Sequence, residues 1–170
     1  MQEYFSLFGL PEHFGIDVSQ LEAAYRTVQA QVHPDRFANR PETERRVAMQ
    51  WATLANEAFR TLKNPVARAS YLLERKGIEQ DVERNTSMSQ AFLLQQMEWR
   101  EAVEEAADDA HELKRLEQEL ERDNRVMLDD LGRALDEEQD LSQASELVRR
   151  LMFMDKLRQE INEALARLEN

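Results

Sequence analysis

The residues best suited to chemistry in this 170-residue chain are His33 and Asp35, which flank Pro34. An imidazole beside a carboxylate could serve as a general base with an orienting partner. The neighbouring sequence indicates no nucleophile or oxyanion donor, so a hydrolase is the least supported interpretation. A second interpretation is that both side chains only cap helices or stabilise a turn. A third is that a rigid turn presents the imidazole and the carboxylate to another protein.

A helix is predicted to lead into this turn. Ser19 and Glu22 have the spacing of a capping box, which indicates a helix start. Apolar residues then recur at helical spacing on one face, at Leu21, Tyr25, Val28 and Val32. Pro34 lacks the N–H that would extend the helix, and it disfavours helical backbone at His33. The helix should therefore end here, with an exposed face that carries Arg26, Gln29 and His33.

A second helix is predicted to follow, with Pro41 in its first turn. Its apolar residues again have helical spacing, at Val47, Leu54, Ala58, Phe59 and Leu62. The two helices should form an antiparallel hairpin that exposes residues 33–36 in its connection. We expect the hairpin core to include Tyr25, Phe59, Leu62, Phe5 and Phe8.

The remainder of the chain predicts a second all-helical domain, because strand signals are almost absent. Gly77 marks a helix end, and the polar stretch 77–89 is predicted to be a linker. Three periodic segments follow, at about 90–109, 112–137 and 142–169, and should close into an antiparallel three-helix bundle. We therefore expect an all-α protein with domains at 1–76 and 90–170.

The apolar stripes of these segments predict the bundle core. Their members are Phe92, Trp99, Val103, Ala106 and Ala110 in the first segment, Leu113, Leu116, Leu120, Met127, Leu131 and Leu135 in the second, and Leu147, Leu151, Met154, Ile161, Leu165 and Leu168 in the third.

Some apolar residues do not join these stripes. Leu93, Leu94 and Met97 lie off the first stripe, and Phe153 lies off the third. Charged residues surround the first three, at Glu98, Arg100, Glu101, Glu104 and Glu105. An apolar cluster with a charged rim is typical of a partner-binding site. The alternative is that this face packs against the first domain.

Charge and composition exclude several classes of function. Residues 1–76 carry 10 Lys and Arg against 9 Asp and Glu, whereas residues 77–170 carry 12 against 25, within a net charge of −12. An acidic second half repels nucleic-acid phosphates, so no nucleic-acid partner is expected. The absence of an 18-residue apolar run and of a signal-peptide pattern predicts a soluble, unexported protein.

The lack of Cys and the spacing of the few His residues argue against a metal site. The chain has no Cys, which excludes thiolate sites and disulfides and suits the cytoplasm. The three histidines, at 13, 33 and 111, form no ligand pair at helical spacing.

Several sequence blocks resemble a known family. The His33-Pro34-Asp35 turn between two helices, with residues 55–59 after it, resembles the J-domain of DnaJ-type co-chaperones. The blocks at residues 4–11, 64–65, 68–73, 92–94 and 97–101 are similar to the HscB family, the J-type co-chaperones of iron–sulfur cluster assembly, in its bacterial form. This resemblance covers nearly the whole chain.

The resemblance implies a non-enzymatic co-chaperone without a cofactor. The J-domain would stimulate the ATPase of a specialised DnaK-type chaperone of the HscA kind, through His33, Pro34, Asp35, Arg26 and Arg36. The bundle would bind an IscU-like scaffold protein and deliver it to that chaperone. The implied scaffold contacts are Leu93, Leu94, Met97, Glu98, Arg100, Glu101, Glu105 and Phe153.

One departure from the J-domain pattern precedes the turn. Gln31 and Val32 stand where many J-domains have Lys and Tyr. The reduced positive charge favours a dedicated chaperone partner. The alternative function is an acidic helical adaptor that does not stimulate a chaperone ATPase.

Overall fold

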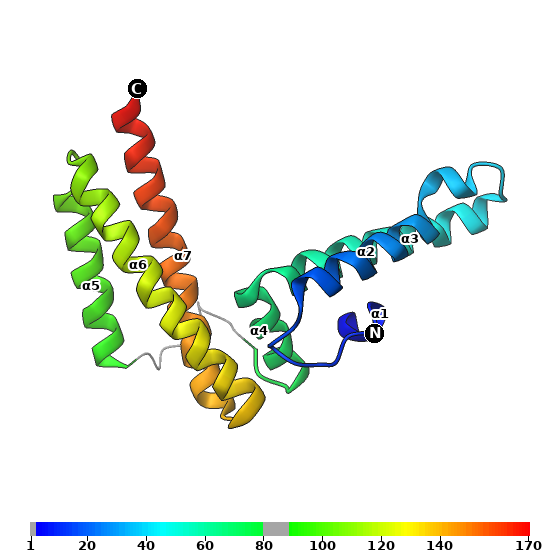
Figure 1. Cartoon of the computed structure of the whole chain (residues 1–170), viewed down its shortest axis with the longest axis horizontal. Helices are drawn as coiled ribbons and strands as arrows, with labels where there is room; N and C mark the ends of the chain where they lie inside the picture. Colours follow the sequence, from blue (N-terminus) through cyan, green and yellow to red (C-terminus); the bar gives the residue numbers. More distant parts are fainter. Residues whose placement is uncertain (1–2, 80–88) are drawn as a thin grey trace. The chain divides into compact units, whose positions relative to one another are not determined.

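The computed structural model of the chain describes residues 3–79 and 89–170, and every regular element in these two ranges is helical (Figure 1). This confirms the predicted all-α class. The elements in chain order are α1 Tyr4–Leu7, α2 Val18–Val32, the 3-10 turn η1 Pro34–Phe37, α3 Glu42–Lys63, α4 Pro65–Arg75, α5 Gln90–Glu105, α6 Ala110–Gly132, the π-helical turn η2 Arg133–Glu137, and α7 Leu141–Glu169. None of the helices in the described ranges is long and apolar enough to span a membrane.

The chain divides into two compact units, residues 1–72 and 73–170. The boundary falls inside α4, slightly before the predicted end of the first domain at residue 76. Of the predicted linker 77–89, residues 80–88 lie outside the described part of the chain. Gly77 ends α4 as expected: its φ is +85°, and its N–H donates to the carbonyl of Glu74 at 2.9 Å.

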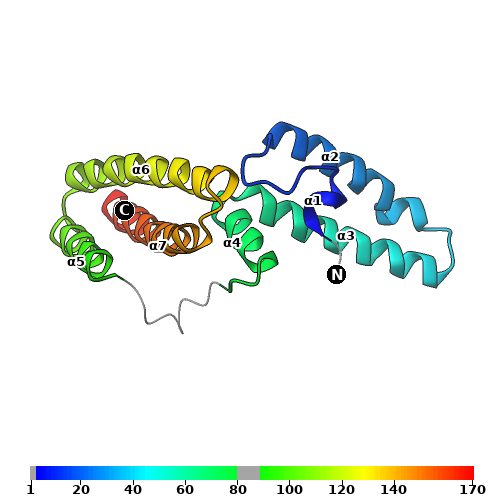
Figure 2. The same cartoon turned by 90° about the horizontal axis from the view of Figure 1, so that it is seen from below.

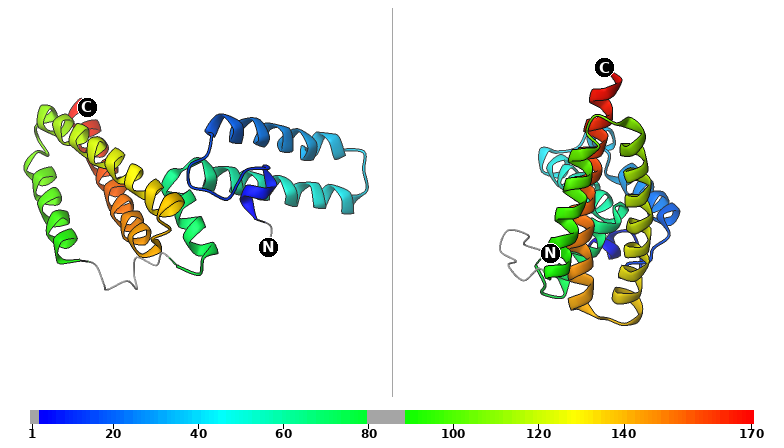
Figure 3. Two further views of the ribbon diagram at one scale, coloured as in Figure 1. Left: turned by 60° about the horizontal axis from the view of Figure 1, so that its bottom comes forward. Right: turned by 90° about the vertical axis from the view of Figure 1, so that its left-hand side faces the viewer.

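The first unit is built on the α2–α3 hairpin, whose helices run antiparallel and side by side (Figure 3). The short helix α1 packs against α3, and the Tyr4 ring stacks on that of Tyr71 with 4.5 Å between centroids. Buried Arg68 donates to the carbonyl of Leu62 at 2.6 Å and lies over the Phe14 ring. The hairpin is therefore fastened at the end remote from the η1 turn. Its buried apolar residues include Phe5, Phe8, Leu10, Phe14, Leu21, Ala48, Ala55, Ala58 and Leu62.

The helix starts differ from the predicted ones by one or two residues. α2 begins at Val18, because the Asp17 carboxylate accepts hydrogen bonds from the backbone N–H groups of Ser19 and Gln20. The proposed Ser19 cap was therefore wrong: Asp17, two residues earlier, satisfies the orphan N–H groups. Pro41 is the residue before α3 and not part of its first turn.

Two predicted core positions of the hairpin are also revised. Tyr25 and Phe59 are half-buried, and their rings stack on each other at the surface between α2 and α3. Val47 is 51% exposed, because it lies near the start of α3, where the last turn of α2 and η1 leave a surface groove beside it.

The second unit is a three-helix bundle in which α7 packs against both α6 and α5 (Figure 2). Helix α6 ends in the η2 turn, and Gln139, with a φ of +52°, reverses the chain into α7. One continuous core joins the three helices through Phe92, Trp99, Val103, Ala106, Leu113, Leu116, Leu120, Phe153, Met154, Leu157, Ile161 and Ala164. Ala110 and Leu168, which were predicted to be core residues, are exposed because they lie at the first turn of α6 and the last turn of α7.

Candidate functional site

The His33-Pro34-Asp35 turn exposes its two ionisable side chains at the tip of the hairpin. Pro34 begins η1 immediately after α2 ends, as predicted. The Nδ1 of His33 accepts a hydrogen bond from the backbone N–H of Asp35 at 3.2 Å, and it lies 3.7 Å from a carboxylate oxygen of the same residue. The carboxylate therefore projects into solvent beside the imidazole, which suits contact with another protein.

Arg36 strengthens the turn by folding back on α2. Its backbone N–H donates to the carbonyl of His33 at 3.0 Å, and its guanidinium donates to the carbonyl of Ala30 at 3.3 Å. Ala30 lies in the last turn of α2, where carbonyls lack helical partners, so this bond caps the helix end. Arg26 is exposed two turns earlier on the same face as His33. The predicted positive face is thus present at the surface.

An apolar groove of about 320 Å³ lies beside the turn and was not predicted from the sequence. Val32 and Phe37, which flank the turn, form one side, and Val47 and Trp51 of α3 form the other. The exposed pair Val47 and Trp51 has the spacing of neighbours on one helix face. This spacing could have indicated the groove from the sequence, but it is equally typical of two residues in a helix core.

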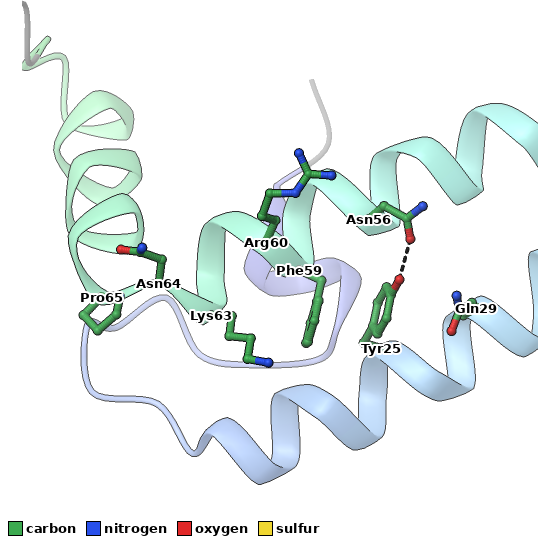
Figure 4. Close-up of a pocket in the computed structure, with 8 residues that line it drawn as sticks. All are labelled: Tyr25, Gln29, Asn56, Phe59, Arg60, Lys63, Asn64 and Pro65. Carbon is green, nitrogen blue, oxygen red and sulfur yellow. Dashed lines mark hydrogen bonds between the residues drawn. The ribbon is translucent and has the colours of Figure 1, made fainter. Parts of the chain in front are cut away.

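A second and larger pocket, of about 640 Å³, lies between α2 and α3 (Figure 4). The stacked rings of Tyr25 and Phe59 stand 4.1 Å apart in it, and the Tyr25 hydroxyl donates to the side-chain oxygen of Asn56 at 2.5 Å. Lys63 lies over the Phe59 ring and 3.8 Å from a carboxylate oxygen of Glu22. These contacts occupy the side chains that a ligand would need.

The bundle presents an exposed apolar patch on α5, formed by Leu93, Leu94 and Met97. Their exposed fractions are 45%, 58% and 69%. The predicted acidic rim is exposed around it, at Glu98, Glu101, Glu104 and Glu105. The patch therefore has the apolar centre and charged edge of a protein-binding face.

Phe153, in contrast, does not belong to this exposed patch. Only 8% of its surface is exposed, and its ring meets that of Phe92 edge to face with 6.0 Å between centroids. The prediction of an exposed Phe153 was wrong because α7 has a neighbour on each of two faces and so buries more than one stripe. Arg100, another predicted contact, pairs with Glu160 of α7.

A third pocket, of about 310 Å³, lies between α5 and α6 and is acidic. Its lining includes Glu98, Glu119 and Asp123, with Arg115 and Trp99. Desolvation raises the pKa of the Asp123 carboxyl, and the charge of Glu119 raises it further, against an opposing effect of Arg122.

Within the described part of the chain, no three His, Cys, Asp or Glu side chains gather as a metal site.

Comparison with known proteins identifies the family. Residues 88–162 match the family described as the HSCB C-terminal oligomerisation domain. The co-chaperone protein HscB homologues of Aromatoleum aromaticum and Azoarcus sp. are each 53% identical to this chain, over 99% of its length and 96–97% of theirs. The chain belongs to the HscB family of co-chaperones.

Solved HscB structures share the fold of this chain over nearly its full length. The chaperone HscB from Vibrio cholerae matches with a TM-score of 0.87 at 35% identity, covering 98% of this chain and 99% of that one. The human co-chaperone protein HscB matches with a TM-score of 0.90 at 30% identity, covering 95% and 81% respectively. These HscB matches confirm the resemblance seen in the sequence, including a J-domain followed by a helical bundle.

Proposed function

We propose that this HscB protein stimulates the ATPase of a specialised, HscA-like DnaK-type chaperone and delivers an IscU-like iron–sulfur scaffold protein to it. The observation that carries the proposal is that each unit of the chain has an exposed face suited to contact with another protein. The first is the turn at His33-Pro34-Asp35, and the second is the apolar patch on α5.

The turn supports the chaperone contact through its chemistry. It holds a carboxylate and an imidazole in a fixed, exposed geometry, and Arg26 and Arg36 add positive charge nearby. Such a surface complements a polar, acidic groove on an ATPase domain, and charge complementarity favours rapid and specific association.

The chain itself would catalyse no reaction and hold no cofactor, and it would act in the cytoplasm.

The patch supports scaffold binding in a different way. Leu93, Leu94 and Met97 offer apolar area that solvent contacts in the free protein, and its burial would supply the main free energy of association. Glu98, Glu101 and Glu105 would form the polar rim and discriminate between partners. Arg100, the remaining charged residue of the predicted face, pairs with Glu160 of α7.

The decisive experiment measures ATP hydrolysis by a purified HscA-like chaperone with this protein, with the scaffold protein, and with both. We expect stimulation by this protein alone and a larger effect when the scaffold is added. An acidic adaptor would bind the scaffold without changing the rate. The absence of any stimulation would refute the co-chaperone role.

A further inference from the structure

One arginine side chain of α5 contacts two residues of α7. The Arg100 guanidinium donates to both carboxylate oxygens of Glu160, at 3.0 and 3.2 Å. It also lies over the Phe153 ring, 5.4 Å from the centroid. A planar guanidinium suits this combination, since it can stack on an aromatic face while its N–H groups donate in the plane.

A second arginine makes the reciprocal contact. Arg150 of α7 lies over the Phe92 ring of α5, 5.2 Å from the centroid, and donates to Glu146 at 2.9 Å. The two rings also touch each other edge to face. The α5–α7 contact is therefore built from a pair of aromatic rings, each covered by an arginine from the opposite helix.

Helix α5 depends on such contacts because few of its side chains are buried. It buries three side chains, at Phe92, Trp99 and Val103, whereas α7 buries ten. Elements with few buried apolar contacts open most readily from a folded structure. The patch that we assign to the scaffold lies on this helix.

Arg100 is also adjacent to the patch. It follows Met97 by three residues and Leu93 by seven, so the three side chains share one face of α5. Along this face, the exposed side chains of Leu93 and Met97 are followed by Arg100, which forms the bridge with Glu160. Any tilt of α5 away from α7 at this bridge would reorient the patch.

We propose that Arg100 is a positioning residue, which holds α5 against α7 and thereby orients the apolar patch for its protein partner. This inference rests on the proposed scaffold binding. It differs from the expectation that Arg100 itself contacts the scaffold. Pre-ordering the helix lowers the conformational cost of binding, so the bridge would increase affinity without touching the partner.

A charge-exchange experiment on the full chain separates the two roles. The variants are Arg100→Glu, Glu160→Arg and the double exchange, and scaffold affinity is measured by calorimetry. We expect each single variant to weaken binding severalfold, since it loses a half-exposed ion pair, and in one case a cation–π contact, and creates a like-charge pair. The double exchange should recover most of this loss. Glu163→Arg, an exposed change one turn away on α7, is the matched control and should leave affinity unchanged.

Hydrogen exchange of the α5 amides provides a readout that does not require the scaffold. Exchange should accelerate in both single variants and return towards the wild-type rate in the double exchange. The proposal is overturned if Glu160→Arg leaves both affinity and exchange unchanged, if it tightens binding, or if the double exchange recovers neither. A wild-type protein that fails to bind the scaffold, with the exchange pattern as expected, would instead refute the proposed function and leave the helix-positioning role standing.

Discussion

The ring of Phe153 on α7 meets the ring of Phe92 on α5 edge to face, with 6.0 Å between their centroids. Both residues belong to the continuous core of the bundle. This contact separates the buried aromatic residues of α5 and α7 from the exposed apolar residues of α5. Phe92 and Phe153 hold α5 on α7, while Leu93, Leu94 and Met97 remain exposed.

The first prediction uses this separation. Changing Leu93, Leu94 and Met97 together to Ala should greatly weaken scaffold binding, because buried anchors at interfaces typically cost at least about 2 kcal/mol each and are not additive. The melting temperature should hardly change, because these side chains are exposed. Calorimetry and thermal melts of the same variant test both statements. Val126→Ala, at an exposed apolar residue of α6, is the matched control.

The second prediction concerns the buried ring. Phe153→Ala should lower the free energy of unfolding by about 3–5 kcal/mol, as large-to-small core changes do. Chemical denaturation followed by circular dichroism provides the measurement. A Phe153→Ala variant with unchanged stability but lost scaffold binding would show that this ring is a contact and not a core residue.

The third prediction tests the turn. His33→Gln and Asp35→Asn should each abolish ATPase stimulation, because each removes one of the two side chains presented to the chaperone. The far-UV helical signal and scaffold affinity should remain, since both side chains are exposed. His13→Gln, at another exposed histidine of the first unit, should retain full stimulation. Normal stimulation by both turn variants would contradict the J-domain assignment.

The fourth prediction concerns division of labour between the units. A fragment of residues 1–79 keeps all of α4 and its Gly77 C-terminus, so it should fold with a cooperative melt. It should stimulate the chaperone weakly and lose the additional effect of the scaffold, because the patch is missing. Ending the fragment at residue 72 would remove buried Leu73 and the helix end, and should destabilise it. An unfolded 1–79 fragment would show that the units share one core.

The fifth prediction follows from Asp123. Because burial raises the pKa of its carboxyl in the folded state, the unfolded state holds fewer protons in the interval between the ordinary value near 3.8 and the raised value. Ionisation of Asp123 therefore lowers the free energy of unfolding as pH rises through that interval. The protein remains destabilised by this group at neutral pH. Asp123→Asn should raise the melting temperature at pH 7, with the gain shrinking below pH 4. Asp129→Asn, at an exposed site of the same helix, is the matched control and should leave the melting temperature at pH 7 unchanged.

The sequence by itself determined where most helices end and which residues form the turn. Pro34 cannot donate the backbone hydrogen bond that would extend α2, and Gly77 adopts the positive φ that terminates α4. These are local effects, so they can be read from neighbouring residues. Periodicity likewise predicted the three bundle helices and the exposure of Leu93, Leu94 and Met97, because each of these depends on one helix face at a time.

Only the tertiary structure decided how many faces each helix buries. Phe153 lies off the main stripe of α7 and is nevertheless buried, because α5 covers a second face of that helix. Val47 fits the stripe of α3 and is exposed, because the end of α2 leaves a groove beside it. The pairing of Arg100 with Glu160 joins residues 60 positions apart, so no local pattern indicates it. Burial at such positions depends on neighbours that the fold brings together, and a periodic pattern carries no information about their number.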